Sequence, residues 1–96
     1  MESERMELTT RKYNKQTYTF YLNKLTSGNN FGQLYVTCET PPNDFGYPDV
    51  VLLASPSYDN NFTPRAYTLY RTLPNWILNK IETTLIKLAK EYTNEI

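Results

Sequence analysis

The stretch that decides the fold is AYTLYRTLPNWILNK, residues 66–80, in which a strand pattern changes into a helix pattern. Apolar and polar side chains alternate as far as Tyr70, which is typical of a β-strand. Pro74 then suits the first turn of a helix, with Thr72 as the expected N-cap. Apolar residues recur at helical spacing as far as about Tyr92. The sequence therefore predicts a final strand followed by one long C-terminal helix.

Three further strand patterns precede this stretch. Residues 16–25 (QTYTFYLNKL) and 33–40 (QLYVTCET) alternate in polarity on either side of a Gly- and Asn-containing turn, so they predict a hairpin. Residues that lie directly opposite each other in a hairpin have side chains on the same face of the sheet. If core residues such as Phe20 and Val36 are opposite each other, their two residue numbers must add up to an even number. That parity predicts an odd-length loop of three or five residues. The continuous apolar run at 50–55 (VVLLAS) predicts an interior strand.

These patterns predict an α+β fold with the order β-β-β-β-α. A four-stranded antiparallel sheet is expected to pack one face against the long C-terminal amphipathic helix. Residues 1–12 are polar and irregular, so we expect a flexible N-terminal arm, with residues 13–96 forming a single α+β domain. Tyr67 and Leu69 of the final strand are expected to lie in the core.

Two apolar residues of the helix, Trp76 and Ile86, lie outside its main apolar stripe. A small sheet covered by one helix buries little apolar surface, and association of two copies buries more. We therefore expect a homodimer whose interface contains Trp76 and Ile86.

Several classes of chemistry are disfavoured by the composition. The chain of 96 residues contains no histidine, which is the commonest general base and metal ligand. Its single cysteine, Cys38, falls on the apolar side of a strand and is interpreted as a core residue. No glycine-rich phosphate-binding loop is present. We therefore expect a protein that is not an enzyme and that uses no metal and no cofactor.

The cysteine content and the apolar runs of the sequence also indicate the cellular compartment. A single cysteine fits a reducing environment. No apolar run approaches the roughly 18 residues that span a bilayer, and the first residues lack the apolar core of a secretion signal. We expect a cytoplasmic protein without a membrane partner, located in the host cytoplasm if the chain is viral.

Aromatic residues make up 15% of the chain, and three tyrosines are expected on the sheet face that the helix leaves uncovered. An exposed aromatic platform stacks on unpaired bases, and basic side chains beside it neutralise phosphates. The sequence thus predicts binding of single-stranded nucleic acid. The expected stacking residues are Tyr21, Tyr35 and Tyr70, and the expected phosphate contacts are Lys15, Lys24, Arg65 and Arg71.

A protein partner is the alternative hypothesis. Exposed tyrosines are also common in protein interfaces. Between Cys38 and Thr63 every charged residue is acidic, so this part of the chain forms acidic loops. A small inhibitor or adaptor, of viral or phage origin, could bind a host protein through the tyrosine face or through these loops.

The predicted order of four strands and a helix resembles the single-stranded DNA-binding domain of the transcriptional coactivator PC4 family. The local likeness lies in AYTLYRTLPNWILNKIETTL, with Pro74 and Trp76 close together at the helix entry. The resemblance implies dimerisation through the helix and binding of unpaired DNA on the sheet, with Trp76 as a helix-packing residue. The Lys- and Gly-rich strands of that family are not evident here, and the two long loops depart from its pattern.

Overall fold

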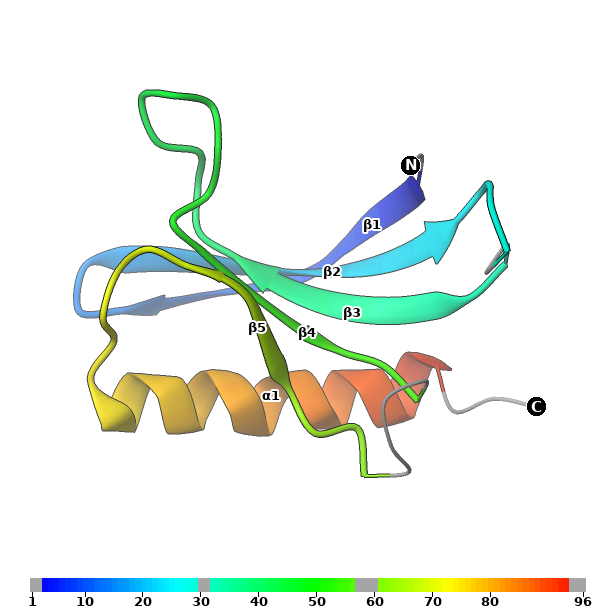
Figure 1. The fold of residues 1–96 in the computed structure, drawn as a ribbon. Coiled ribbons are helices and arrows are strands. Elements are labelled where there is room, and N and C mark those ends of the chain that lie inside the picture. Colours follow the sequence, from blue (N-terminus) through cyan, green and yellow to red (C-terminus); the bar gives the residue numbers. More distant parts are fainter. Residues whose placement is uncertain (1–2, 30–31, 57–60, 94–96) are drawn as a thin grey trace.

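The computed structural model describes residues 3–29, 32–56 and 61–93, which form an antiparallel sheet followed by a helix packed on it (Figure 1). The predicted α+β class is confirmed. Within these residues the sheet has five strands, each paired antiparallel with its neighbour in sequence, in the order β1-β2-β3-β4-β5. The elements are β1 (Ser3–Tyr13), β2 (Gln16–Leu25), β3 (Leu34–Glu39), β4 (Val50–Ala54), β5 (Arg65–Leu69) and α1 (Asn75–Thr93).

The first strand corrects two expectations, the four-stranded sheet and the flexible arm over residues 1–12, of which residues 1–2 lie outside the described residues. β1 pairs with β2 along its length, from Ser3 to Tyr13. The two strands are joined by a tight turn in which Asn14 and Lys15 have φ angles of 53° and 69°. Two-residue turns with positive φ match the twist of the flanking strands, and Asn favours them. Because β1 is an edge strand with mostly exposed side chains, its sequence lacks a clear apolar alternation.

The predicted hairpin of β2 and β3 is confirmed, and so is the parity of its register. Phe20 lies opposite Cys38 rather than Val36, and the apolar faces of the two strands still match. The connection between the end of β2 at Leu25 and the start of β3 at Leu34 covers residues 26–33 and is longer than the expected three or five residues. A hydrogen bond from Gly32 N to Leu25 O, 2.7 Å long, closes this loop.

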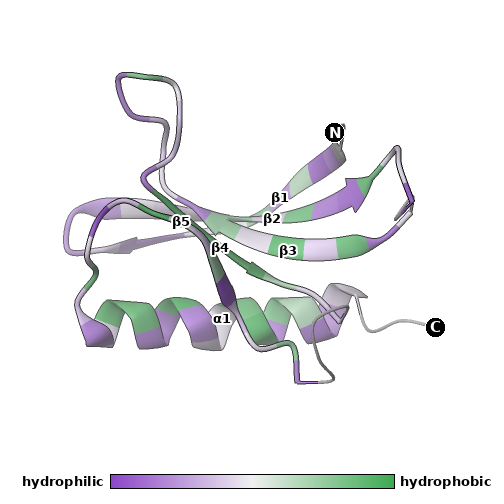
Figure 2. Cartoon of the chain, in the orientation of Figure 1, coloured by the Kyte–Doolittle hydropathy of each residue, from purple (hydrophilic) through white to green (hydrophobic). Residues whose placement is uncertain are grey.

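The helix covers one face of the sheet, where it packs against β3 and β4. Its buried residues recur every four positions, at Ile77, Ile81, Leu85 and Ala89. Figure 2 shows apolar segments alternating with polar ones along α1 and along the strands. The helix stripe and the facing strands form one core. Its remaining buried members are Tyr18, Phe20, Val36, Cys38, Val50, Leu52, Ala54, Phe62 and Leu73.

The start of the helix differs from the prediction. The backbone N–H groups of Ile77 and Leu78 both donate to the carbonyl oxygen of Pro74, at 3.1 and 3.0 Å. Because this carbonyl accepts the first helical hydrogen bond, the helix begins at Asn75 and Thr72 lies before the cap position.

The placement of Tyr67 and Leu69 in the core was wrong. Tyr67 is 76% exposed and Leu69 is 47% exposed. β5 is the edge strand, and α1 packs on β3 and β4 instead of covering it. The β4–β5 register also shifts at Val51 and Leu52, which leaves Tyr67 as an extra residue between two paired positions. The bulge turns the tyrosine outward.

Candidate functional site

The connection between β3 and β4 is an ordered loop that rises from the sheet on the side away from α1 (Figure 1). The Asn43 side chain closes its bend, because its Oδ1 accepts hydrogen bonds from the backbone N–H groups of Phe45 (2.8 Å) and Tyr47 (3.2 Å). Asn43 N also donates to Tyr47 O at 2.8 Å. Gly46 adopts a φ of 88°, which favours glycine. The loop therefore holds two exposed aromatic residues on a hydrogen-bonded turn.

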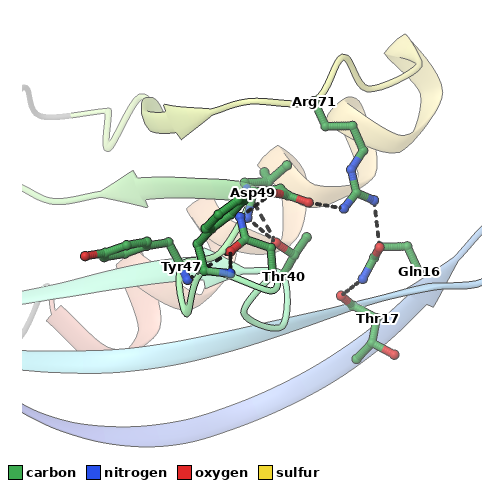
Figure 3. A network of polar contacts seen from close by, with 9 residues as sticks. Gln16, Thr17, Thr40, Tyr47, Asp49 and Arg71 are labelled. Carbon is green, nitrogen blue, oxygen red and sulfur yellow. Dashed lines mark hydrogen bonds and ion pairs between the residues drawn. The ribbon is translucent and has the colours of Figure 1, made fainter.

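Asp49 fastens this loop to two other parts of the fold (Figure 3). Its Oδ1 accepts a hydrogen bond from Asn43 Nδ2 at 3.0 Å, and its Oδ2 forms an ion pair with Arg71 Nη2 at 2.6 Å. The other guanidinium nitrogen, Arg71 Nη1, donates to Gln16 Oε1 at 2.7 Å. Tyr70 N donates to Asp49 O at 2.8 Å. One aspartate thus connects the loop with the β5–α1 junction and the start of β2.

The environment of Asp49 favours its ionised form. The hydrogen bond from Arg71 lowers the pKa of this carboxyl most, and the bond from Asn43 lowers it further, below the usual 3.8. Desolvation acts in the opposite direction and is outweighed. The backbone of Asp49 is anchored as well, because its N–H donates to Thr40 Oγ1 at 3.0 Å.

A groove lies between this loop and β5. Its volume is about 630 Å³. Val51 and Thr68, which face each other in the β4–β5 pairing, lie on the sheet side of it. We call it the aromatic groove, and its lining residues are Asn43, Phe45, Tyr47, Pro48, Asp49, Val51, Tyr67, Thr68 and Tyr70.

Four aromatic side chains of the groove are largely in solvent. Phe45 is 84% exposed, Tyr47 67% and Tyr70 79%, and Tyr67 at the β5 bulge is similarly open. Large apolar side chains gathered in one exposed patch are unusual on a monomer surface and mark interaction sites. The groove also contains polar groups that can orient a ligand, since Asn43, Asp49 and Thr68 belong to its lining.

A second group of polar and aromatic residues lies on the same side of the sheet. Tyr21 and Tyr35 both belong to the face that α1 leaves uncovered, as their register with Thr37 and Asn23 shows. Asn23 Nδ2 donates to the Tyr21 carbonyl at 3.2 Å and to Thr37 Oγ1 at 3.1 Å. Both tyrosines are half-buried rather than exposed. They therefore offer less ring surface than the residues of the aromatic groove.

The Tyr21 ring is covered from above. The guanidinium carbon of Arg5 lies 3.8 Å from the centre of that ring, and Arg5 Nη1 forms an ion pair with Glu39 Oε2 at 2.7 Å. Glu39 also accepts a hydrogen bond from Thr37 Oγ1 at 3.1 Å. The charges of Arg5 and Glu39 are therefore paired with each other.

The basic residues predicted to contact phosphate do not form one patch. Lys15 occupies the β1–β2 turn, and Lys24 is exposed near the opposite end of β2. Arg65 begins β5 and pairs with Leu53, so the length of that strand separates it from Arg71. Arg71 forms an ion pair with the Asp49 carboxylate.

The structure groups the predicted stacking residues in two places. Tyr21 and Tyr35 lie together on β2 and β3. Tyr70 follows β5, with β3 and β4 between it and the strand of Tyr21.

The two residues predicted to form a dimer interface have different surroundings. Trp76 is 50% exposed and packs edge-on against Tyr13, with ring centroids 6.3 Å apart. Tyr13 in turn contacts the buried ring of Tyr18. Ile86 is partly exposed on α1. Trp76 therefore has an intramolecular packing role, and dimerisation stays a prediction.

Cys38 is fully buried, and desolvation raises the pKa of its thiol to about 12. Burial explains the residue as part of the core. Across residues 3–29, 32–56 and 61–93, no group of three or more His, Cys, Asp or Glu side chains is placed to hold a metal ion. No helix within those ranges is long and apolar enough to cross a membrane.

Sequence reasoning missed most of the aromatic groove. It selected Tyr70, but Phe45 and Tyr47 were assigned to a Pro-rich connection and Tyr67 to the core. The available signal was FGYP at residues 45–48, in which two aromatic residues flank a glycine between polar and proline residues. Aromatic side chains on a loop are rarely needed for packing, so they favour a binding role.

Comparison with protein-family models, with curated proteins and with solved structures finds no match for this chain. The resemblance to the PC4 family therefore stays a hypothesis, and the sheet carries one strand more than the order on which it was based. The function has to be argued from the side chains of the chain itself.

Proposed function

We propose that this chain is a non-catalytic binding protein that holds a segment of another protein in its aromatic groove. The observation that carries the proposal is the gathering of four exposed aromatic side chains around one groove. Tyrosine and other aromatic residues contribute a large share of binding energy in protein interfaces. This is the inhibitor or adaptor alternative of the sequence analysis, with the loop over residues 40–49 as its main element.

The order of the loop supports this proposal. Binding to a mobile loop costs conformational entropy, and a loop held in one conformation before binding avoids much of that cost. Asn43 and Asp49 supply the internal hydrogen bonds that hold the two loop aromatics in place. The rings on the β5 side belong to the sheet edge. A partner would meet a surface that is already shaped.

A non-catalytic role is supported by the side chains that the chain has. With no histidine in the sequence, the commonest general base is missing. The one thiol lies in the core, and burial raises its pKa, so it is a poor nucleophile. The ionised Asp49 is engaged by two hydrogen bonds that fasten the loop.

The test is selection from a random peptide library displayed on phage, with immobilised protein as bait. We expect groove ligands to be enriched on the wild-type protein and lost on the double variant Tyr67→Ser/Tyr70→Ser. Both side chains are exposed, so the double variant should fold normally. Tyr92→Ser is the matched control, since Tyr92 is an exposed tyrosine on α1 outside the groove. The absence of any peptide that depends on Tyr67 and Tyr70 would overturn the proposal.

Single-stranded nucleic acid is the second candidate ligand. The observation that favours it is the position of Tyr21 and Tyr35 on the same helix-free face. It ranks second because Arg5 already covers the Tyr21 ring and because the proposed phosphate contacts are dispersed.

Fluorescence titration with a labelled unstructured oligonucleotide at two salt concentrations tests this candidate. Binding that weakens steeply with salt and is lost in Tyr35→Ala would establish it. No binding at low salt would remove it.

A further inference from the structure

We propose that the aromatic groove recognises a positively charged side chain, lysine or arginine, on the segment that it binds. This inference rests on the proposed function and adds the chemical class of the ligand. It follows from the charges that surround the groove and from a contact of the same type elsewhere on the sheet.

The groove is electrostatically suited to a cation. The faces of aromatic rings carry partial negative charge and attract ammonium and guanidinium groups. None of the residues that line the groove is a lysine or an arginine. Its one ionised lining residue, Asp49, is balanced by Arg71.

A further carboxylate lies at the rim. Asp44 stands in the loop between two lining residues, Asn43 and Phe45, and is exposed. Its side chain has no hydrogen-bond or ion-pair partner within the part of the chain that the structure describes. Because Asp49 is paired with Arg71, the charge available to a ligand at the groove is the negative charge of Asp44.

The chain already binds one of its own cations in this way. The Arg5 guanidinium lies 3.8 Å above the Tyr21 ring and 2.7 Å from the Glu39 carboxylate. Glu39 is directly opposite Val51, a lining residue of the groove. The Arg5–Tyr21–Glu39 contact and the aromatic groove are therefore neighbours on one face of the sheet. The aromatic groove offers the same two elements, tyrosine rings and a carboxylate, to a group from outside.

An anionic ligand fits this surface poorly. Arg71, which follows the lining residue Tyr70, is engaged by both Asp49 and Gln16 through its two terminal nitrogens. A phosphate or carboxylate in the groove would approach ring faces and the Asp44 side chain without a basic residue of the lining to compensate. The charges therefore favour a basic protein segment over an acidic segment or a nucleic-acid backbone.

The inference is tested with two small probes of the same shape, choline and its uncharged analogue 3,3-dimethylbutan-1-ol. Each is titrated into the isotopically labelled protein, and the aromatic ¹H–¹³C resonances of Tyr47, Tyr67 and Tyr70 are followed by NMR. We expect choline to shift these resonances with an affinity at least about fivefold higher than that of the analogue. The choline shifts should weaken in Asp44→Asn and persist in Tyr92→Ser.

Equal responses to the two probes, or no response to choline, would overturn the inference. The peptide selection distinguishes this failure from failure of the proposed function. Peptides that depend on Tyr67 and Tyr70 but lack lysine and arginine would preserve the proposed function and refute the preference for a cation. Enrichment of acidic peptides, or competition of an oligonucleotide with choline, would also refute it.

Discussion

At the scale of single residues, Asp49 has the widest effect on the candidate site. Its carboxylate contacts Asn43 on the loop and Arg71 beyond β5, which are otherwise separate segments. Arg71 was predicted from sequence to contact phosphate, which stays a prediction, and in the structure its guanidinium forms an ion pair with this carboxylate. An arginine at a strand end has the same appearance in sequence whether its partner is a ligand or an aspartate 22 positions away.

The lowered pKa of Asp49 predicts a pH-dependent contribution to stability. Because the pKa in the folded state lies below the usual 3.8, the contribution is complete above that value and is lost as pH falls through the folded-state pKa. We expect urea unfolding to show wild type more stable than Asp49→Asn at about pH 6, with the difference shrinking at about pH 3.

The control for this prediction is Asp44→Asn. It removes a charge from the same loop at a side chain with no partner in the described part of the chain. Its stability should stay close to that of wild type at both pH values. A difference between wild type and Asp49→Asn that is the same at both pH values would contradict the role given to the Arg71 pair.

At the scale of elements, the loop over residues 40–49 and the helix α1 are held in place by different interactions. The loop has little apolar burial and is held by side-chain to backbone hydrogen bonds centred on Asn43. The helix is held on the sheet by a buried apolar stripe. Their responses to substitution should differ accordingly.

Replacement of Asn43 by alanine should loosen the loop and leave the sheet intact. The variant loses the acceptor of the Phe45 and Tyr47 amides and the donor to Asp49. Each such hydrogen bond contributes about 0.5–1.5 kcal/mol, so we expect amide exchange at Tyr47 to accelerate by about tenfold or more. Exchange at the Phe20 amide in β2 is the internal control. Unchanged exchange at Tyr47 would show that the loop does not depend on Asn43.

Replacement of Leu85 by alanine should destabilise the whole fold. Leu85 is fully buried between α1 and the sheet, and truncation of such a side chain costs about 2–5 kcal/mol. Urea unfolding followed by circular dichroism measures this cost. Lys87→Ala, on the exposed side of the same helix, should stay within about 0.5 kcal/mol of wild type. Similar values for the two variants would argue against the observed packing of α1.

At the scale of the whole molecule, the sheet has two different faces. One face is closed by α1, and the other carries the aromatic groove together with the Arg5–Tyr21–Glu39 contact. The side of α1 that faces away from the sheet is a third surface, and Ile86 is its main partly exposed aliphatic residue outside the buried stripe. We propose that the chain forms a homodimer through this outer side of α1.

Sedimentation velocity tests the dimer. We expect wild type to sediment as a dimer and Ile86→Lys to sediment as a monomer with the same unfolding midpoint, because Ile86 lies outside the core. Thr83→Lys adds the same charge to an exposed site of the helix and is the matched control. A wild-type protein that sediments as a monomer at all concentrations would reject the interface.

The sequence alone was sufficient for the features that local periodicity sets in the interior of the sheet and along the helix. Alternation predicted β2 and β3, a continuous apolar run predicted β4, and the matching of apolar faces predicted the parity of the β2–β3 register. The helical spacing of apolar side chains predicted the buried stripe of α1. These patterns are set by which side of an element is apolar, and that information lies within a few consecutive residues.

Only the tertiary structure decided what lies at the edges of the sheet. β1 was missed because an edge strand needs few apolar residues, and Tyr67 was misplaced because its exposure depends on a bulge and on where α1 comes to rest. The aromatic groove depends on the folding of the β3–β4 loop toward β5, through contacts such as Asp49 with Arg71. Contacts between residues far apart in sequence leave no local periodicity. The sequence therefore determined the layers of this protein, and the tertiary structure decided which of its aromatic side chains are available to a partner.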